Sequence, residues 1–168
     1  TMVSGNTSVS KSNRAFEIRE GLLESPQVIA LLQAHLDAME DTAPPESRHA
    51  LDISGLRGPG IVFWSMWDGS QLAGVGALQH LCGEHAEIKS MKTAPAYLRT
   101  GVAKTMLQHI ITQAAARGYS SLSLETGSMD FFAPARSLYR NFGFKPCEPF
   151  GTYIEDPNSV FMTMSLGG

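Results

Sequence analysis

The sequence is poor in cysteine and lacks clustered histidine. Its two cysteines, Cys82 and Cys147, have neither a C-x-x-C pattern nor the spacing of metal ligands, and its five histidines do not pair at positions i and i+4. We therefore expect no bound metal. We also expect two reduced thiols in a cytoplasmic protein rather than a disulfide.

The sequence also lacks runs of basic residues and long hydrophobic runs. Its formal net charge is -3 and its sequence pI is about 5.9, so it lacks the clustered positive charge that binds the phosphate backbone of DNA or RNA. Apolar runs such as residues 61–64 fall far short of the roughly 20 residues that a membrane-spanning helix needs. The opening residues show no signal-peptide pattern, and we expect a cytoplasmic protein that binds neither nucleic acid nor membrane.

The apolar residues that are present suffice for one core. A chain of 168 residues with 43% hydrophobic composition is long enough for one well-packed domain and short for two. Residues 1–14 are polar, rich in serine and asparagine and without periodicity, which predicts a disordered tail. We expect residues 15–168 to form a single domain.

The order of the apolar patterns predicts a mixed fold. We expect strands at residues 15–19, 61–67, 71–81, 84–93 and 120–126, a strand from Phe144, and a last strand at 160–166. We expect helices from Pro26, at residues 102–118 and at residues 134–141. This order is typical of an α/β (α+β) fold, in which a mixed, mostly antiparallel sheet is flanked by helices on both faces.

Residues 41–60 have the composition of a loop. A short helix could open at Pro45 and carry Ser47, Arg48 and His49. Polar groups on such a connection are typical of a substrate lid, and more often of an ordinary loop. The sequence leaves both interpretations open.

The turn before residue 102 predicts an anion site. Gly101 stands where the chain passes from strand to helix, with Arg99 and Lys104 on either side. The first turn of a helix has free N–H groups and a partial positive charge, and a glycine lets a phosphate approach the backbone. A pyrophosphate-bearing ligand would fit there, although many α/β proteins have such a junction with nothing bound.

A second glycine pattern, Gly74-Val75-Gly76, has the look of a dinucleotide fingerprint. No helix follows it and no third glycine arrives at the proper distance, so a dinucleotide-dependent oxidoreductase is disfavoured. The two glycines are better explained by a bulge or by a close approach of backbone.

Two stretches read as known motifs: residues 98–103, L-R-T-G-V-A, and residues 135–144, A-R-S-L-Y-R-N-F-G-F. The first stretch resembles Q/R-x-x-G-x-G/A, the acyl-coenzyme A motif of the GNAT superfamily of N-acetyltransferases. The second resembles A-x-x-L-Y-x-x-x-G-F of the same superfamily. Leu98 departs from the first motif, and Phe132 stands where many members have asparagine. The resemblance covers residues 16–166, and P-P-E-S-x-H-A-L-D near Pro44 is similar to a bacterial subgroup of small single-domain members.

The resemblance implies the GNAT fold and an enzyme that uses acetyl-CoA. Such an enzyme acylates a primary amine of a small molecule or peptide by direct attack in a ternary complex, without a metal. The resemblance also implies that backbone groups of Met91, Lys92 and Thr93 hold the pantetheine arm and the acetyl carbonyl. The implied contacts to the rest of the coenzyme are Arg99, Thr100, Gly101, Val102, Ala103 and Lys104.

Two residues are implied in the chemistry. Tyr139 resembles the tyrosine that protonates the departing sulfur in many members, and its alternative role is a structural tyrosine half buried against the sheet. Glu87 resembles the glutamate that acts as a base through water in the histone-acetylating branch, and its alternative is a solvent-facing strand glutamate. The candidates for the acceptor site, on loops or strand ends, are Ser47, His49, Glu125 and Tyr153.

A rival function from another class shares the same coenzyme site. A non-catalytic module could hold CoA or an acyl-CoA as a sensor or assembly element. Such a module would bind the coenzyme without turning it over, which distinguishes it from an enzyme. Exposed strand edges also make a homodimer possible.

Overall fold

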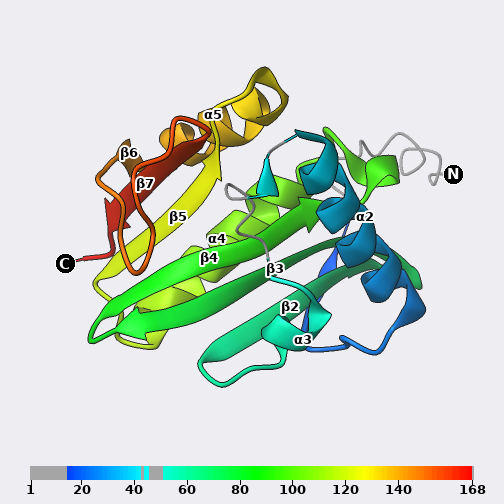
Figure 1. Cartoon of the computed structure of the whole chain (residues 1–168). Coiled ribbons are helices and arrows are strands. Elements are labelled where there is room, and N and C mark those ends of the chain that lie inside the picture. The colour runs from blue at the N-terminus through cyan, green and yellow to red at the C-terminus, as the bar shows by residue number, and fades with distance from the viewer. Residues whose placement is uncertain (1–14, 43, 46–50, 168) are drawn as a thin grey trace, which may run out of the picture.

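The chain folds around one seven-stranded sheet, and the computed structural model describes residues 15–42, 44–45 and 51–167. The strands lie in the order β1-β2-β3-β4-β5-β7-β6 (Figure 1). They are β1 (Glu17–Glu20), β2 (Ile61–Asp68), β3 (Gln71–Cys82), β4 (His85–Thr93), β5 (Ser121–Gly127), β6 (Lys145–Pro146) and β7 (Ser159–Ser165). The helices are α2 (Pro26–Thr42), α3 (Ile53–Leu56), α4 (Val102–Ala116) and α5 (Ala133–Asn141), with short 3-10 turns η3 (Pro95–Tyr97) and η4 (Asp130–Phe132).

The pairing of the strands confirms the predicted mixed, mostly antiparallel sheet. Among the described strands, β4 and β5 run parallel and the other neighbouring pairs run antiparallel. The strands β2, β3 and β4 are joined by tight turns in which Gly69 and Gly83 have positive φ, as hairpin turns favour. A parallel neighbour needs a crossover connection, and α4 supplies it between β4 and β5.

Helices cover both faces of the sheet, as the sequence predicts (Figure 1). On one face, α4 contributes buried residues at three-and-four spacing to a large hydrophobic cluster, including Met106, Leu107 and Ile110. On the other face, α2 and α3 form a second cluster with strand residues such as Phe63 and Trp67. The alternation of side chains along the strands supplies both clusters from the same sheet.

The glycine pair of β3 allows α4 to approach the sheet closely. A Cβ atom at Gly74 would lie 2.8 Å from Val102 Cγ1, and one at Gly76 would lie 2.9 Å from Ile110 Cδ1. Real Cβ atoms essentially never come so close, so any other residue at these positions would force the facing side chains of α4, or the helix itself, to shift. The interpretation of these glycines as a close approach is confirmed.

The strands β4 and β5 separate halfway along the sheet. Their pairing runs from His85–Ser121 to Glu87–Ser123, and beyond this point β4 continues to Thr93 without pairing to β5. The register of β4 against β3 also shifts near Ser90, which has a φ of +54°. A bulge of this kind bends a strand and redirects its side chains, and here it adjoins the gap between β4 and β5.

The segment at residues 41–60 contains a helix that the sequence analysis did not predict. Asp52 caps α3 by accepting a hydrogen bond from the Gly55 amide at 2.8 Å, which is the usual way for an aspartate to begin a helix. The helix proposed at Pro45, with Ser47, Arg48 and His49, lies outside the described residues. The tail at residues 1–14 lies outside them as well.

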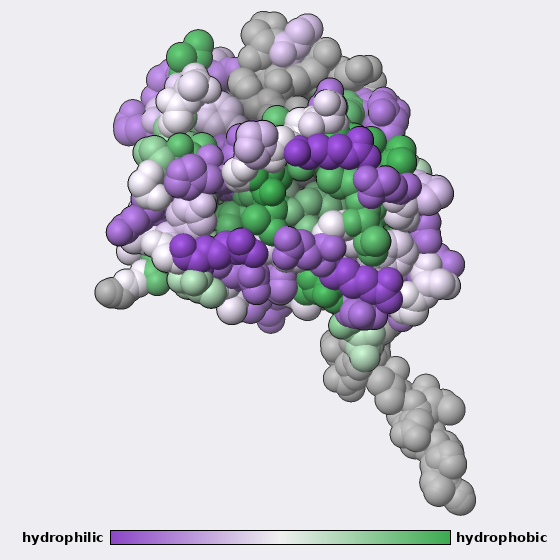
Figure 2. Space-filling view, turned by 90° about the horizontal axis from the view of Figure 1, so that it is seen from below, coloured by the Kyte–Doolittle hydropathy of each residue, from purple (hydrophilic) through white to green (hydrophobic). Residues whose placement is uncertain are grey.

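The surface combines a hydrophobic hollow with hydrophilic surroundings. Figure 2 shows hydrophobic residues gathered at the centre of the face seen from below, with strongly hydrophilic residues around them. Within the described part of the chain, no helix has the length and apolar character needed to cross a membrane.

Candidate active site

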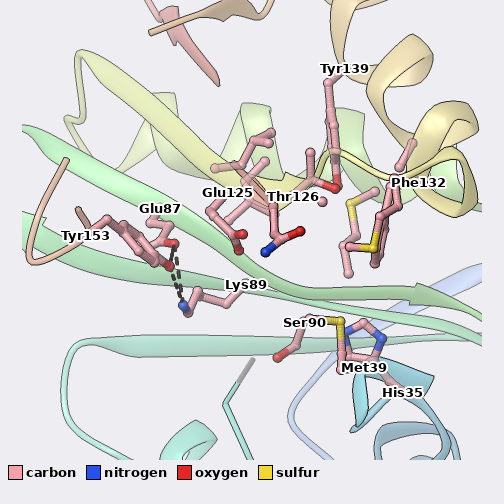
Figure 3. A pocket seen from close by; sticks show the side chains of 17 residues that line it. His35, Met39, Glu87, Lys89, Ser90, Glu125, Thr126, Phe132, Tyr139 and Tyr153 are labelled. Carbon is pink, nitrogen blue, oxygen red and sulfur yellow. Dashed lines mark hydrogen bonds and ion pairs between the residues drawn. The ribbon is translucent and has the colours of Figure 1, made fainter. Parts of the chain in front are cut away.

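The candidate site lies where β4 and β5 separate. A cavity of about 120 Å³ opens there, lined by residues of α2, β4, β5 and α5 and by Tyr153 and Asn158 from the loop between β6 and β7. Figure 3 shows the labelled side chains converging on it from these elements. Segments far apart in the sequence therefore build one site.

Side chains reach the cavity from both faces of the sheet. Ala86 and Ile88 of β4 belong to the hydrophobic cluster with α4, as does Tyr139 of α5. Because side chains alternate along a strand, Glu87 and Lys89 point to the opposite face, which α2 covers. The gap between β4 and β5 joins the two faces at the cavity.

Glu87, Lys89 and Tyr153 form a closed polar cluster. The Tyr153 hydroxyl donates to Glu87 Oε2 at 2.5 Å and accepts a hydrogen bond from Lys89 Nζ at 2.9 Å. Lys89 Nζ also lies 3.4 Å from Glu87 Oε2, and Glu87 is only 3% exposed. Burial, followed by the charge of Glu87, holds the pKa of Tyr153 well above its ordinary value. The two opposite charges thus compensate each other, as buried charges require.

Glu125 is a second carboxylate of the cavity. It lies on β5, lines the cavity and accepts a hydrogen bond from Ser159 Oγ at 2.8 Å. Its pKa is raised from 4.5 to about 7, mainly by burial. The hydrogen bond from Ser159 and the charge of Lys89 act against this rise, and the charges of Glu87 and Asp156 contribute to it. Glu125 therefore changes its protonation state near neutral pH.

Tyr139 is held in a fixed orientation on α5. It is 7% exposed, and its ring packs against Phe144 with ring centroids 5.7 Å apart. Figure 3 shows its hydroxyl pointing into the cavity. Burial and then the charge of Glu125 raise the pKa of Tyr139 to about 12, so the hydroxyl keeps its proton at neutral pH.

Sequence reasoning missed several polar residues of the cavity, among them His35 and Ser90. His35 lies on α2 in the stripe of Leu31 and Met39, and this spacing could have placed it on the inner face of the helix. Burial and the charge of Lys92 lower the pKa of His35 to about 4, so its ring is neutral. Ser90 has a buried Oγ without a hydrogen-bond partner, and no local signal in the sequence predicts the bulge that positions it.

The start of α4 lies open to a ligand. Gly101 precedes the helix with a φ of +90°, and no atom lies within 4 Å of the place that its Cβ would occupy. Arg99 also has a positive φ, +64°, a strained conformation of a kind that clusters at ligand sites. The first intrahelical amides of α4 lack partners inside the helix, so the turn presents N–H groups that an anion can accept.

Some side chains of this turn are buried in the protein and others are exposed to solvent. Val102 is buried against the sheet, and Thr100 is buried with its hydroxyl bonded to the Tyr97 carbonyl. Arg99 and Lys104 are exposed. A ligand at this turn would thus meet backbone amides and two positive charges.

The structure brings some of the predicted site residues together. Those that line the cavity are Glu87, Met91, Glu125, Tyr139 and Tyr153. Thr93 instead pairs with Gly74 in the sheet, and Lys92 pairs with Val75; neither residue lines the cavity. Ser47 and His49 lie outside the described residues, and their roles stay predictions.

A metal site is not found within residues 15–42, 44–45 and 51–167, where no three His, Cys, Asp or Glu side chains group in a way that could hold an ion. Both cysteines are free thiols: Cys82 is exposed and Cys147 is partly buried. Neither lines the cavity.

Comparisons with known proteins agree with this geometry. The family model for the acetyltransferase (GNAT) family matches residues 28–144. The chain is 59% identical over 144 residues to the uncharacterized N-acetyltransferase YsnE of Bacillus subtilis, and this match covers 86% of the chain and 95% of the relative.

Solved structures share the fold. A GNAT-family acetyltransferase from Staphylococcus aureus superposes with a TM-score of 0.70 at 18% identity, covering 91% of this chain and 100% of that one. The PaiA N-acetyltransferase of Thermoplasma acidophilum, in complex with coenzyme A, superposes with a TM-score of 0.68 at 17% identity, covering 90% and 99%. The match of the family model over most of the chain, together with the seven-stranded sheet that opens between β4 and β5, shows that this chain belongs to the GNAT family of acetyltransferases.

Proposed function

We propose that this chain is an acetyl-CoA-dependent N-acetyltransferase, which moves an acetyl group to a primary amine of a small molecule or peptide by direct attack in a ternary complex. The observation that carries the proposal is the meeting of Tyr139 and Glu125 in one cavity. Membership of the GNAT family supports the same reaction. A hydroxyl and a carboxylate held at one site can act as proton donor and proton acceptor for one reacting centre.

The turn before α4 fits the diphosphate of the coenzyme. Gly101 leaves space at the backbone, the first amides of α4 are available as donors, and Arg99 and Lys104 add positive charge. The coenzyme A complex of the PaiA neighbour supports acetyl-CoA as the donor here. We propose that the thioester enters the gap between β4 and β5, where backbone amides near Met91 can stabilise negative charge on the carbonyl oxygen.

The neutral amine that attacks the thioester must give up one proton as its nitrogen bonds to the carbonyl carbon. We assign this proton to Glu125, because a carboxylate with a pKa of about 7 accepts a proton at neutral pH better than one of ordinary acidity. The nitrogen then forms a bond with the carbonyl carbon, and negative charge develops on the carbonyl oxygen. Collapse of this intermediate breaks the bond between carbon and sulfur, and the electron pair leaves on the sulfur.

The departing thiolate needs a proton donor, and Tyr139 is positioned for this role. Part of the rise in the pKa of Tyr139 comes from the negative charge of Glu125. When Glu125 takes the proton of the amine, this charge disappears and Tyr139 becomes a stronger acid at the moment when the thiolate forms. The proton on Glu125 can afterwards restore Tyr139, so the products are an amide and free CoA thiol.

The prediction that Glu87 is the base stays a prediction. Its carboxylate already accepts the Tyr153 hydroxyl and pairs with Lys89, which leaves it less free than Glu125 to receive a proton. The pH dependence of kcat/KM in Glu87→Gln and in Glu125→Gln distinguishes the two roles. The variant of the base loses the acidic limb of the profile, whereas the other variant keeps it.

Release of free thiol from acetyl-CoA tests the proposed function. A purified enzyme should release thiol when primary amines are added, and calorimetric titration with CoA should show binding. A non-catalytic sensor would bind CoA and release no thiol with any amine. Absence of binding heat would refute both functions.

Two finer points also stay proposals. The sheet ends in β1 on one side and β6 on the other, and a strand edge can pair with a second copy to form a homodimer, which light scattering would detect as a doubled mass. A cytoplasmic location fits the free thiols of Cys82 and Cys147.

A further inference from the structure

The loop between β6 and β7, residues 147–158, folds back over the face of the sheet that α2 covers. Its aromatic residues anchor it there. The ring centroid of Tyr153 lies 5.2 Å from that of Phe150 and 5.3 Å from that of Phe161 on β7, and Phe150 also contacts His85 of β4 at 5.6 Å. Edge-on and tilted ring contacts at these distances are favourable, so they hold the ring of Tyr153 from the side of the loop.

The hydroxyl end of Tyr153 is held as firmly as the ring. Its bonds to Glu87 and Lys89 connect it to β4 (Figure 3). A buried Glu87 without these partners would be costly, so the cluster resists any rotation of Tyr153 away from the cavity. Tyr153 is therefore a fixed part of the cavity lining rather than a mobile side chain.

The position of Tyr153 places it on the acceptor side of the cavity. The turn before α4, where the coenzyme is proposed to bind, belongs to the face covered by α4, and Tyr139 reaches the cavity from that face. Tyr153, Glu87 and Lys89 lie on the opposite face, together with His35 of α2. An amine that attacks a thioester held from the α4 face must approach from this opposite side.

We propose that Tyr153 limits the size of the acceptor, and that Glu87 is the positioning residue that holds Tyr153 in place. This inference rests on the proposed function. It implies that the enzyme uses compact, unbranched primary amines and excludes amines that carry a bulky group beside the nitrogen. The small volume of the cavity, about 120 Å³, agrees with a compact acceptor.

The experiment compares kcat/KM for propylamine and for diphenylmethylamine, which carries two rings beside its nitrogen. In Tyr153→Ala the ratio of the bulky to the compact amine should rise at least about tenfold, the scale on which a pocket discriminates by size. Tyr119→Ala is the matched control, because Tyr119 bonds to His80 and does not line the cavity. This control should leave the ratio unchanged, and the KM for acetyl-CoA should stay within twofold in both variants.

Two variants of Glu87 test the positioning role. Glu87→Gln keeps an oxygen that can accept the Tyr153 hydroxyl, and it should keep both the parent ratio and the acidic limb of the pH profile. Glu87→Leu loses the acceptor, and its ratio should rise towards that of Tyr153→Ala. A simple loss of folding would lower kcat/KM for both amines equally and would not move the ratio.

Three results would overturn the proposal. One is an unchanged ratio in Tyr153→Ala with parent-like stability in urea unfolding, and another is loss of the acidic limb in Glu87→Gln, which would make Glu87 the base. The third is a parent enzyme that binds CoA but releases no thiol with any amine, which refutes the proposed function and this inference with it. The first two results leave the proposed function standing, so the two failures are distinguishable.

Discussion

Replacing Glu125 with glutamine should stabilise the protein above neutral pH while removing its base. The folded chain raises the pKa of Glu125 from 4.5 to about 7, so the folded state holds this proton to a higher pH than the unfolded chain does. The stability that comes from the proton is fully present below pH 4.5 and is lost as the pH rises through about 7. A pKa shift of one unit corresponds to about 1.4 kcal/mol. The free energy of unfolding of the parent should therefore fall by about 2.5 kcal/mol between pH 5 and pH 8 through Glu125, whereas Glu125→Gln lacks this loss.

Urea unfolding followed by the fluorescence of Trp64 and Trp67 measures this difference. The free energy of unfolding of Glu125→Gln, relative to the parent, should grow by about 2.5 kcal/mol from pH 5 to pH 8. Glu84→Gln is the control, because Glu84 is exposed in the turn between β3 and β4, and its difference from the parent should not grow.

The kinetic arm uses the same variant. The kcat/KM of the parent should fall about tenfold for each pH unit below 7. In Glu125→Gln the kcat/KM should not show this fall on the acidic side of the pH profile. A stability difference that is equal at pH 5 and pH 8 would refute the raised pKa. A retained acidic limb would instead refute the catalytic role and leave the electrostatic argument standing.

Three other variants test separate parts of the site and the fold. Tyr139→Phe should lower kcat more than it raises the KM for acetyl-CoA, because the lost hydroxyl acts on the departing sulfur; steady-state kinetics with equal turnover would remove Tyr139 from the mechanism. Gly101→Val should raise the KM for acetyl-CoA at least about tenfold and cost about 1–2 kcal/mol of stability, because its φ of +90° strains any side chain; an unchanged KM would argue against a diphosphate at this turn. Gly74→Ala should destabilise the protein by about 1–3 kcal/mol in urea unfolding, because its Cβ would meet Val102 and the Lys92 carbonyl; parent-like stability would show that α4 shifts freely.

The sequence alone predicted the elements whose signals are local. The apolar patterns predicted strands at residues 61–67 and 71–81 and a helix from residue 102, where β2, β3 and α4 lie, and Gly101 marked the start of a helix with free amides. These signals depend on backbone preferences and on burial of one face, which neighbouring residues determine. The short α3 was missed, because the cap at Asp52 supports only one turn of helix.

The candidate site was predicted in part. Tyr139 came from a motif, and Glu125 and Tyr153 were named from their places on strand ends or loops, whereas His35 and Ser90 did not appear in the prediction. The separation of β4 from β5 depends on where a parallel pairing stops, and the bulge at Ser90 depends on the register against β3. Neither feature has a local sequence signature, because both arise from contacts between distant strands.

The sequence by itself therefore determined the family and the order of the longer helices and strands, and it predicted the place of an anion site. Only the tertiary structure decided which carboxylate is poised near neutral pH. Burial among elements that are distant in the chain raises the pKa of Glu125, against the hydrogen bond from Ser159, which lowers it. A pKa depends on the solvent and the charges around a group in space, and the order of residues does not state them.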